Sequence, residues 1–152
     1  MGTMNYSDML IVEDNIHDIE MITDALNDTG PKISICVFRD GSEVVKYFFN
    51  PDGPVMTRNM QMPKLILLDL KLPKINGLEV LKLIKSNEKT KYIPVVIFTS
   101  SNEETDRMNA YQLGVNSYLV KPLDADMFSH YIKQIVGYWT KMNTNIHETG
   151  NN

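Results

Sequence analysis

Short, continuously apolar runs recur along the chain, separated by longer stretches in which apolar residues are spaced by three or four. Most of the runs are rich in Ile, Val or Leu, and continuous rather than alternating apolarity is typical of strands covered on both faces. They are Met9–Val12, Ile33–Phe38, Leu65–Leu68, Ile93–Phe98 and the weaker Tyr118–Val120. The pattern therefore predicts strands of a parallel sheet buried between helices.

The intervening stretches have helical spacing. A stripe such as Phe128, Ile132, Ile135 and Trp139 marks one face of a helix, and Gly30–Pro31 or Gly114 supplies a stop signal. The predicted helices are Ile16–Thr29, Ser42–Phe49, Gly77–Ser86, Glu103–Leu113 and Asp124–Lys141. Strand and helix thus alternate five times, which predicts a doubly wound α/β fold with right-handed crossovers.

Two segments lie outside this alternation. Asn50–Met62 contains two prolines and three methionines and predicts a long loop, and Asn143–Asn152 is polar and predicts a frayed tail. The whole chain has 152 residues, which suits one domain. We expect no attached output module.

Composition narrows the function classes. The net charge is −4, so a non-specific phosphate-backbone binder is disfavoured and no direct nucleic-acid partner is expected. No segment approaches the ~18 apolar residues of a membrane helix. Cys36 is the single cysteine, which excludes an intramolecular disulfide, and without a secretion signal we expect a cytoplasmic protein with no membrane partner.

Polar residues follow four of the predicted strands. In the common strand order 2-1-3-4-5, strands one, three, four and five are neighbours, and ligands bind at their carboxyl ends. The residues there are Glu13, Asp14, Asp69, Thr99, Ser100 and Lys121. Two carboxylates ~4 Å apart repel by ~4 kcal/mol at an effective dielectric of 20, so the cluster calls for a cation, and Mg²⁺ takes such oxygen ligands. Carboxylates, metal, hydroxyl and lysine together suit phosphoryl transfer.

This arrangement resembles the CheY-like receiver domain of two-component response regulators. The matching segments are Leu10–Asn15, Leu65–Pro73, Asn76–Gly77, Ile93–Ser100 and Leu113–Pro122. Each segment alone is a weak signal of the family, but all of them in this order are a strong one. The resemblance implies a five-stranded (βα)5 flavodoxin-like fold over residues 8–141, with an extension at 1–7 and a tail at 142–152. The long loop and the Tyr138–Trp139 region look like the single-domain receivers associated with phytochromes.

The resemblance assigns a phosphoacceptor and a metal site. It implies that Asp69 attacks phosphorus to form an acyl phosphate, and that Asp69 also binds Mg²⁺. It further implies that Asp14 binds the metal directly, Glu13 through a water, and Lys71 through its backbone carbonyl. The structural alternatives are that Asp69 only caps loop amides and that Asp14 is the N-cap of the first helix.

The resemblance also assigns the residues that respond to the phosphoryl group. Thr99 would bond a phosphoryl oxygen and Lys121 would pair with Asp69 and then with the phosphoryl group. Tyr118 would rotate as Thr99 moves, remodelling the surface of the fourth helix, fifth strand and fifth helix. Pro122 is implied to follow a cis peptide. The alternatives are a hydroxyl satisfying its own turn, a solvated lysine and a plain exposed aromatic.

The predicted function is a self-phosphorylating and autodephosphorylating phosphoacceptor, which would not be a classical enzyme. Its phosphodonor would be a sensor histidine kinase or a histidine phosphotransfer protein. Several other functions are alternatives to this prediction. An aspartyl phosphatase usually carries a second Asp where this chain has Lys71, and a flavodoxin-like cofactor binder would not place acids after strand one. A phosphorylation-independent interaction module is disfavoured by the intact residue set.

A homodimer is a further hypothesis. Tyr131 and Tyr138 lie off the core stripe of the last predicted helix and would support it, with ordinary amphipathic surface as the alternative.

Overall fold

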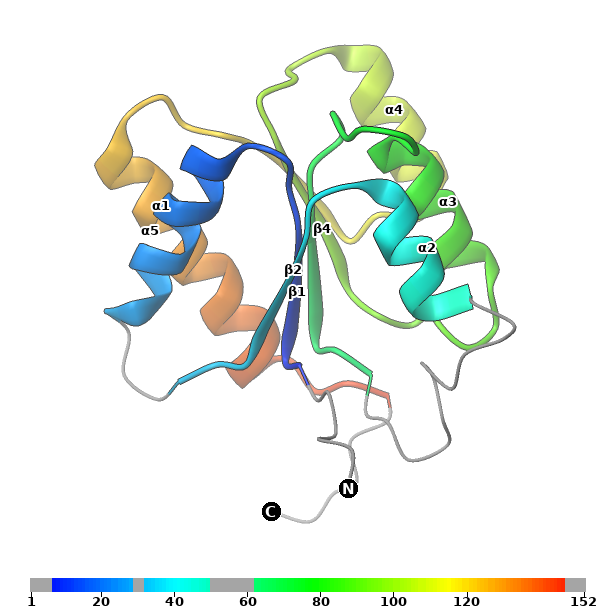
Figure 1. Ribbon diagram of the computed structural model, residues 1–152, viewed down its shortest axis with the longest axis horizontal. Helices are drawn as coiled ribbons and strands as arrows, with labels where there is room; N and C mark the ends of the chain where they lie inside the picture. The colour runs from blue at the N-terminus through cyan, green and yellow to red at the C-terminus, as the bar shows by residue number, and fades with distance from the viewer. Residues whose placement is uncertain (1–6, 29–31, 50–61, 147–152) are drawn as a thin grey trace.

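The computed structural model describes residues 7–28, 32–49 and 62–146 of the chain (Figure 1). Strands and helices alternate, and a π-helical turn, η2, extends the last helix. The strands are β1 (Met9–Val12), β2 (Ile35–Phe38), β3 (Leu65–Leu68), β4 (Val95–Thr99) and β5 (Ser117–Val120). The helical elements are α1 (Ile16–Asn27), α2 (Gly41–Phe49), α3 (Gly77–Ser86), α4 (Glu104–Gln112), α5 (Ala125–Gly137) and η2 (Tyr138–Met142).

The five strands form one parallel sheet in the order β2-β1-β3-β4-β5, which confirms the predicted doubly wound, flavodoxin-like fold. The central strands β1, β3 and β4 are fully buried, as their continuous apolarity predicted. The edge strands β2 and β5 are only half-buried. Cys36 on β2 is accordingly half-buried.

The sheet separates two cores, because successive side chains of a strand point to opposite faces. Figure 1 shows α1 and α5 covering one face and α2, α3 and α4 covering the other. On β1, Met9 and Ile11 pack toward α1 and α5, whereas Leu10 and Val12 pack toward α2 and α3. Both faces of the sheet are therefore apolar, and a polar site is expected at the ends of the strands.

Side-chain caps begin four of the helices. Asn15, Asp40, Asn76 and Asp124 each accept a hydrogen bond from the backbone N–H three residues later, which satisfies a donor that the first turn leaves unpaired. The N-cap of α1 is Asn15 rather than Asp14, so the alternative that assigned this role to Asp14 is wrong.

The last helix differs from its prediction as one continuous helix to Lys141. The α-helix ends at Gly137 and continues as η2, where the Thr140 hydroxyl donates to the Val136 carbonyl oxygen at 2.6 Å. The predicted loop at 50–62 lies almost wholly outside the described residues, as does the end of the predicted tail. Among the helices that the structure describes, none has the length and apolarity needed to cross a lipid bilayer.

Candidate functional site

Four of the predicted site residues meet at the carboxyl edge of the sheet, defined here as the region beyond the C-terminal ends of β1, β3, β4 and β5. Glu13, Asp69 and Lys121 directly follow β1, β3 and β5, and Thr99 is the last residue of β4. The backbone hydrogen bonds between neighbouring strands continue past the strand ends. The Asp69 N–H donates to the Val12 carbonyl at 3.0 Å, and the Lys121 N–H donates to the Thr99 carbonyl at 2.7 Å. Parallel pairing therefore brings residues distant in sequence to one place.

The Lys121 ammonium is the centre of this site. Its Nζ lies 2.6 Å from Glu13 Oε1, 2.7 Å from Asp18 Oδ2 and 3.0 Å from Asp69 Oδ2. We call these four residues the ammonium cluster. The Lys121 side chain is 9% exposed, so these charge-assisted bonds are formed largely out of water. The predicted pairing of Lys121 with Asp69 is present, and the solvated-lysine alternative is wrong.

Asp18 is the member of the cluster that sequence reasoning missed. It lies in the first turn of α1, and its backbone N–H donates to the Asn15 side chain at 3.1 Å. The sequence did hold a signal, since an acid three residues after an N-cap at the carboxyl end of β1 begins close to the site. His17, one residue earlier on α1, is exposed.

The Asp69 carboxylate is held on both of its oxygens. Oδ1 accepts the backbone N–H of Leu70 at 2.6 Å and of Lys71 at 3.3 Å, while Oδ2 faces Lys121. The following loop folds back closely, because the Gly77 N–H donates to the Leu70 carbonyl and a Cβ at Gly77 would overlap the Asp69 carbonyl oxygen. Asp69 does cap loop amides, as its structural alternative predicted, and its second oxygen also faces a cation.

The pKa values of the two buried carboxyls of the cluster, Glu13 and Asp69, are shifted in opposite directions. Burial and the neighbouring charge of Asp69 raise the pKa of Glu13 to about 7, against the opposing effect of Lys121. Burial also acts to raise the pKa of Asp69, but Lys121, with hydrogen bonds from Glu13 and Thr99, holds it below its usual range. Asp69 is therefore the ionised partner near neutral pH.

The Lys121 ammonium is itself stabilised in its charged form. Burial disfavours the charge, but hydrogen bonds to Asp18 and Glu13 and the charges of Glu13 and Asp69 raise the pKa of Lys121 above its usual range. A permanent cation at this edge is what a transferred phosphoryl group requires.

Two predicted metal ligands are not drawn into the cluster. Asp14 and Lys71 are both exposed, Asp14 accepts a bond from Arg39 Nη2 at its carbonyl oxygen, and Lys71 contributes its N–H to Asp69. In residues 7–28, 32–49 and 62–146, no three His, Cys, Asp or Glu side chains form a group that could hold a metal. The Lys121 ammonium, bonded to both Glu13 and Asp69, takes the place a cation would have between them. The roles of Asp14 and Lys71 stay predictions.

The donor chemistry of the site nevertheless fits a hard divalent cation. Glu13 and Asp69 supply buried carboxylate oxygens, and burial together with the neighbouring charge of Asp69 raises the pKa of Glu13. A divalent ion favours the charged form of both groups, and Mg²⁺ commonly binds through one or two carboxylates.

Thr99 and Tyr118 are linked through the loop that follows β4. Thr99 is buried, and its hydroxyl oxygen accepts the Ser101 N–H at 3.3 Å. The Tyr118 hydroxyl donates to the Ser101 carbonyl at 2.9 Å, and the Ser101 hydroxyl donates to Asp106 Oδ2 at 2.5 Å. Tyr118 is thus half-buried and bonded to this loop, so the plain-exposed-aromatic alternative is wrong. Ser100 is exposed beside it.

The predicted cis peptide before Pro122 is wrong. In the part of the chain that the structure describes, every peptide bond is trans. The trans form of an X–Pro bond is favoured by ~0.5–1 kcal/mol, and here it is compatible with both the Lys121–Thr99 backbone bond and the ammonium cluster.

The two tyrosines predicted to support a homodimer differ in exposure. Tyr131 is half-buried against the core between the sheet, α1 and α5, whereas Tyr138 is 47% exposed and meets Trp139 edge-on. Tyr138 thus keeps surface free for contact, and the dimer stays a prediction.

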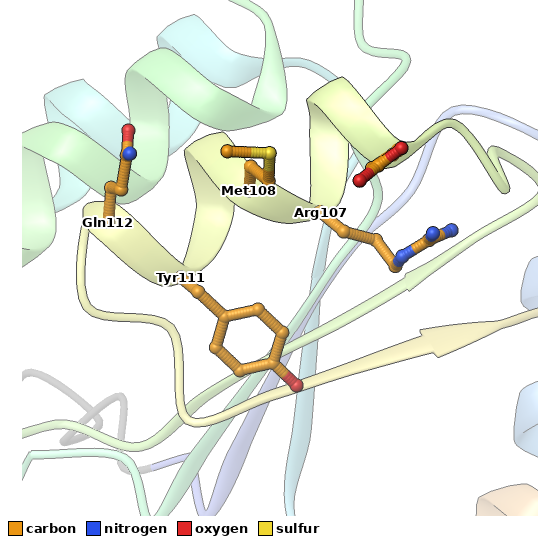
Figure 2. A pocket seen from close by; sticks show the side chains of 5 residues that line it. Arg107, Met108, Tyr111 and Gln112 are labelled. Atoms are coloured by element: carbon orange, nitrogen blue, oxygen red, sulfur yellow. The ribbon is translucent and has the colours of Figure 1, made fainter.

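A shallow hollow lies on α4. Figure 2 shows Arg107, Met108, Tyr111 and Gln112 around it, and Glu104 completes the lining. Met108 and Tyr111 are more than half exposed, at 54% and 57%. It contains none of the predicted site residues, and its Arg107 joins α4 to the loop after β4 through Asn102.

The fold and the ammonium cluster define a receiver, and the chain belongs to the response regulator receiver domain family, which matches residues 9–133. It is 36% identical over 131 residues to response regulator Rcp1 of Synechocystis sp., covering 86% of this chain and 87% of Rcp1. It is 37% identical over 135 residues to FilR2 of Methanothrix harundinacea, covering 89% and 84%.

Solved structures show the same likeness. The phosphorylated cyanobacterial phytochrome response regulator RcpA superposes with a TM-score of 0.82 at 35% identity, covering 93% of this chain and 99% of RcpA. The Mn²⁺-bound form of Rcp1 gives a TM-score of 0.81 at 34% identity, covering 91% and 98%.

Proposed function

We propose that this receiver accepts a phosphoryl group on Asp69, in a Mg²⁺-dependent reaction, from a sensor histidine kinase or a histidine phosphotransfer protein. The observation that carries the proposal is the state of Asp69. One of its oxygens is held by two backbone N–H groups and the other faces the Lys121 ammonium at 3.0 Å. A fixed, ionised carboxylate beside a permanent cation suits nucleophilic attack on phosphorus.

The transfer step is a displacement at phosphorus. A carboxylate oxygen of Asp69 forms the new bond, the P–N bond of the donor phosphohistidine breaks, and the imidazole leaves with the electron pair. Lys121 and the Thr99 hydroxyl would contact the transferred oxygens. The product is an acyl phosphate on the chain itself, so the protein acts as a self-phosphorylating and autodephosphorylating phosphoacceptor rather than a classical enzyme.

Mg²⁺, when bound, would offset the charge on the phosphoryl oxygens. We assign it to Asp69 and Asp14, to Glu13 through a water, and to the Lys71 carbonyl. Support comes from the oxygen donor set of the edge and from the relative Rcp1, which was solved with Mn²⁺.

The signal would leave through the face of α4, β5 and α5. A phosphoryl group that draws the Thr99 hydroxyl changes the loop at Ser101, and Tyr118 is bonded to that loop. The hollow on α4, with its exposed Met108 and Tyr111, lies on the same face and offers an apolar contact for a target.

The experiment is incubation of the purified chain with acetyl phosphate and Mg²⁺, followed by intact mass spectrometry. We expect the mass gain of one phosphoryl group, lost on treatment with hydroxylamine, which cleaves acyl phosphates. No gain should occur in Asp69→Asn or after removal of Mg²⁺ with EDTA.

The matched control is Asp24→Asn, which changes an exposed carboxylate on α1 that is remote from the cluster in the helix. It should be labelled like the wild type. Absence of labelling in the wild type, or equal labelling in Asp69→Asn, would favour a phosphorylation-independent interaction module instead.

A further inference from the structure

The Lys121 ammonium has no hydrogen-bond donor left for a phosphoryl oxygen. An ammonium carries three N–H donors. Among the described residues, its three partners within hydrogen-bond distance are Glu13 at 2.6 Å, Asp18 at 2.7 Å and Asp69 at 3.0 Å. A phosphoryl oxygen that pairs with Lys121 must therefore displace one of these carboxylates.

The three carboxylates are not equivalent once phosphoryl transfer begins. Asp69 becomes the acyl phosphate and loses its anionic oxygen, and Glu13 is among the residues assigned to the metal. Asp18 belongs to neither group, and at 18% side-chain exposure it is the most exposed of the three. Asp18 is therefore the carboxylate that still competes with the phosphoryl group for the Lys121 ammonium.

Asp18 is fixed in place by the helix that carries it. Its N–H is bonded to the Asn15 cap in the first turn of α1, where the helix macrodipole stabilises a carboxylate. The backbone of Lys121 is fixed by its bond to Thr99. The Lys121 side chain must move between partners while Asp18 stays in place.

We propose that Asp18 is a positioning residue that retains the Lys121 ammonium in the unphosphorylated protein and competes with the phosphoryl group for it. The inference rests on the proposed phosphoacceptor function. Asp18 thereby slows acceptance of the phosphoryl group.

The test is the rate of phosphorylation by acetyl phosphate at fixed Mg²⁺, followed by intact mass. Asp18→Asn keeps the shape of the side chain but replaces a charge-assisted bond with a neutral one, so the rate should rise about five- to tenfold. Asp18→Glu restores the carboxylate on the same helix position and should stay within about twofold of the wild type. Asp24→Asn on α1 is the matched charge control and should leave the rate unchanged.

Salt separates local competition from long-range repulsion of the anionic donor. The Debye length is ~3 Å at 1 M salt, so the repulsion is screened there whereas competition at a buried contact persists. A rate increase in Asp18→Asn that survives 1 M NaCl supports the proposal. An increase that disappears in 1 M NaCl, an equal increase in Asp18→Glu or Asp24→Asn, or no increase overturns it.

The two proposals fail differently. Absence of labelling in the wild type refutes the phosphoacceptor function. Normal labelling at Asp69 with an unchanged rate in Asp18→Asn refutes only the role of Asp18. Circular dichroism of each variant confirms that it is folded.

Discussion

Two lysines lie at opposite ends of the sheet, and their surroundings contrast. Lys121 follows β5 at the carboxyl edge and is bonded to three carboxylates. Lys85, near the end of α3, donates instead to neutral acceptors close to the amino ends of β4 and β5. These acceptors are the carbonyl oxygens of Lys91 and Ile93 and the side-chain oxygen of Asn116.

Their pKa values move in opposite directions for this reason. The pKa of Lys121 is raised above its usual range, because bonds to Asp18 and Glu13 outweigh burial. Burial lowers the pKa of Lys85 to about 8, since no carboxylate in the described part of the chain compensates it. Lys85, bonded to neutral oxygens, joins segments of the fold. Lys121, bonded to carboxylates, forms a site that another cation or a phosphoryl group can rearrange.

The largest effect should follow from removing Lys121. In Lys121→Met, three carboxylates of the cluster lose their cation, and removing one member of a buried ion pair costs about 3–5 kcal/mol. We expect a decrease of that order in the free energy of unfolding of the metal-free protein at pH 8, measured in urea. Mg²⁺ should restore part of it, and phosphorylation by acetyl phosphate should fall by at least about a hundredfold.

Lys133→Met is the control, because Lys133 lies on α5 and is not a member of the ammonium cluster. A Lys121→Met protein as stable as the wild type without metal would contradict the electrostatic account of the cluster.

The next effect is a pH dependence caused by Glu13. Its pKa rises from 4.5 to about 7 on folding, so the folded state binds the proton more tightly. The resulting stability is fully present below pH 4.5 and is lost as the pH rises through about 7. We expect the metal-free protein to lose about 2–3 kcal/mol between pH 5 and pH 8, because one pKa unit corresponds to ~1.4 kcal/mol.

Urea unfolding in EDTA across this pH range measures the loss. Glu13→Gln should remove most of the slope, while Glu20→Gln on the exposed side of α1 should keep it. A stability that rises from pH 5 to pH 8 in the wild type would reverse the sign expected for Glu13.

The smallest effect should follow from removing Lys85. Lys85→Met keeps the apolar stem but removes the donors that join α3 to Asn116 and to the segment before β4. We expect a loss of about 1–2 kcal/mol in the free energy of unfolding, because water reaches this half-buried position and satisfies part of the acceptors. Phosphorylation by acetyl phosphate should be unchanged.

Lys82→Met, on the exposed side of the same helix, should leave both quantities unchanged. If Lys85→Met slowed phosphorylation as Lys121→Met does, the division between a structural and a chemical lysine would fail.

Much of the carboxyl edge could be predicted because strand ends are fixed by topology. Once Leu65–Leu68 is a central strand, Asp69 must emerge at its carboxyl end, beside the residue after β1. The same holds for Lys121 after β5. By contrast, the sequence analysis did not identify Asp18, which contacts Lys121 from the first turn of α1. Consecutive helix residues differ by about 100° around the axis, so a one-residue change decides which side chain reaches Lys121.

The sequence alone determined the alternation of strands and helices, the family resemblance and the set of residues at the carboxyl edge. Tertiary structure decided the exposure of Asp14, the entry of Asp18 into the ammonium cluster, the trans bond before Pro122 and the opposite pKa shifts of Lys85 and Lys121. Hydrophobic periodicity records which face of an element is buried. The direction, burial and partners of a polar side chain depend on distant segments that only the folded chain brings together.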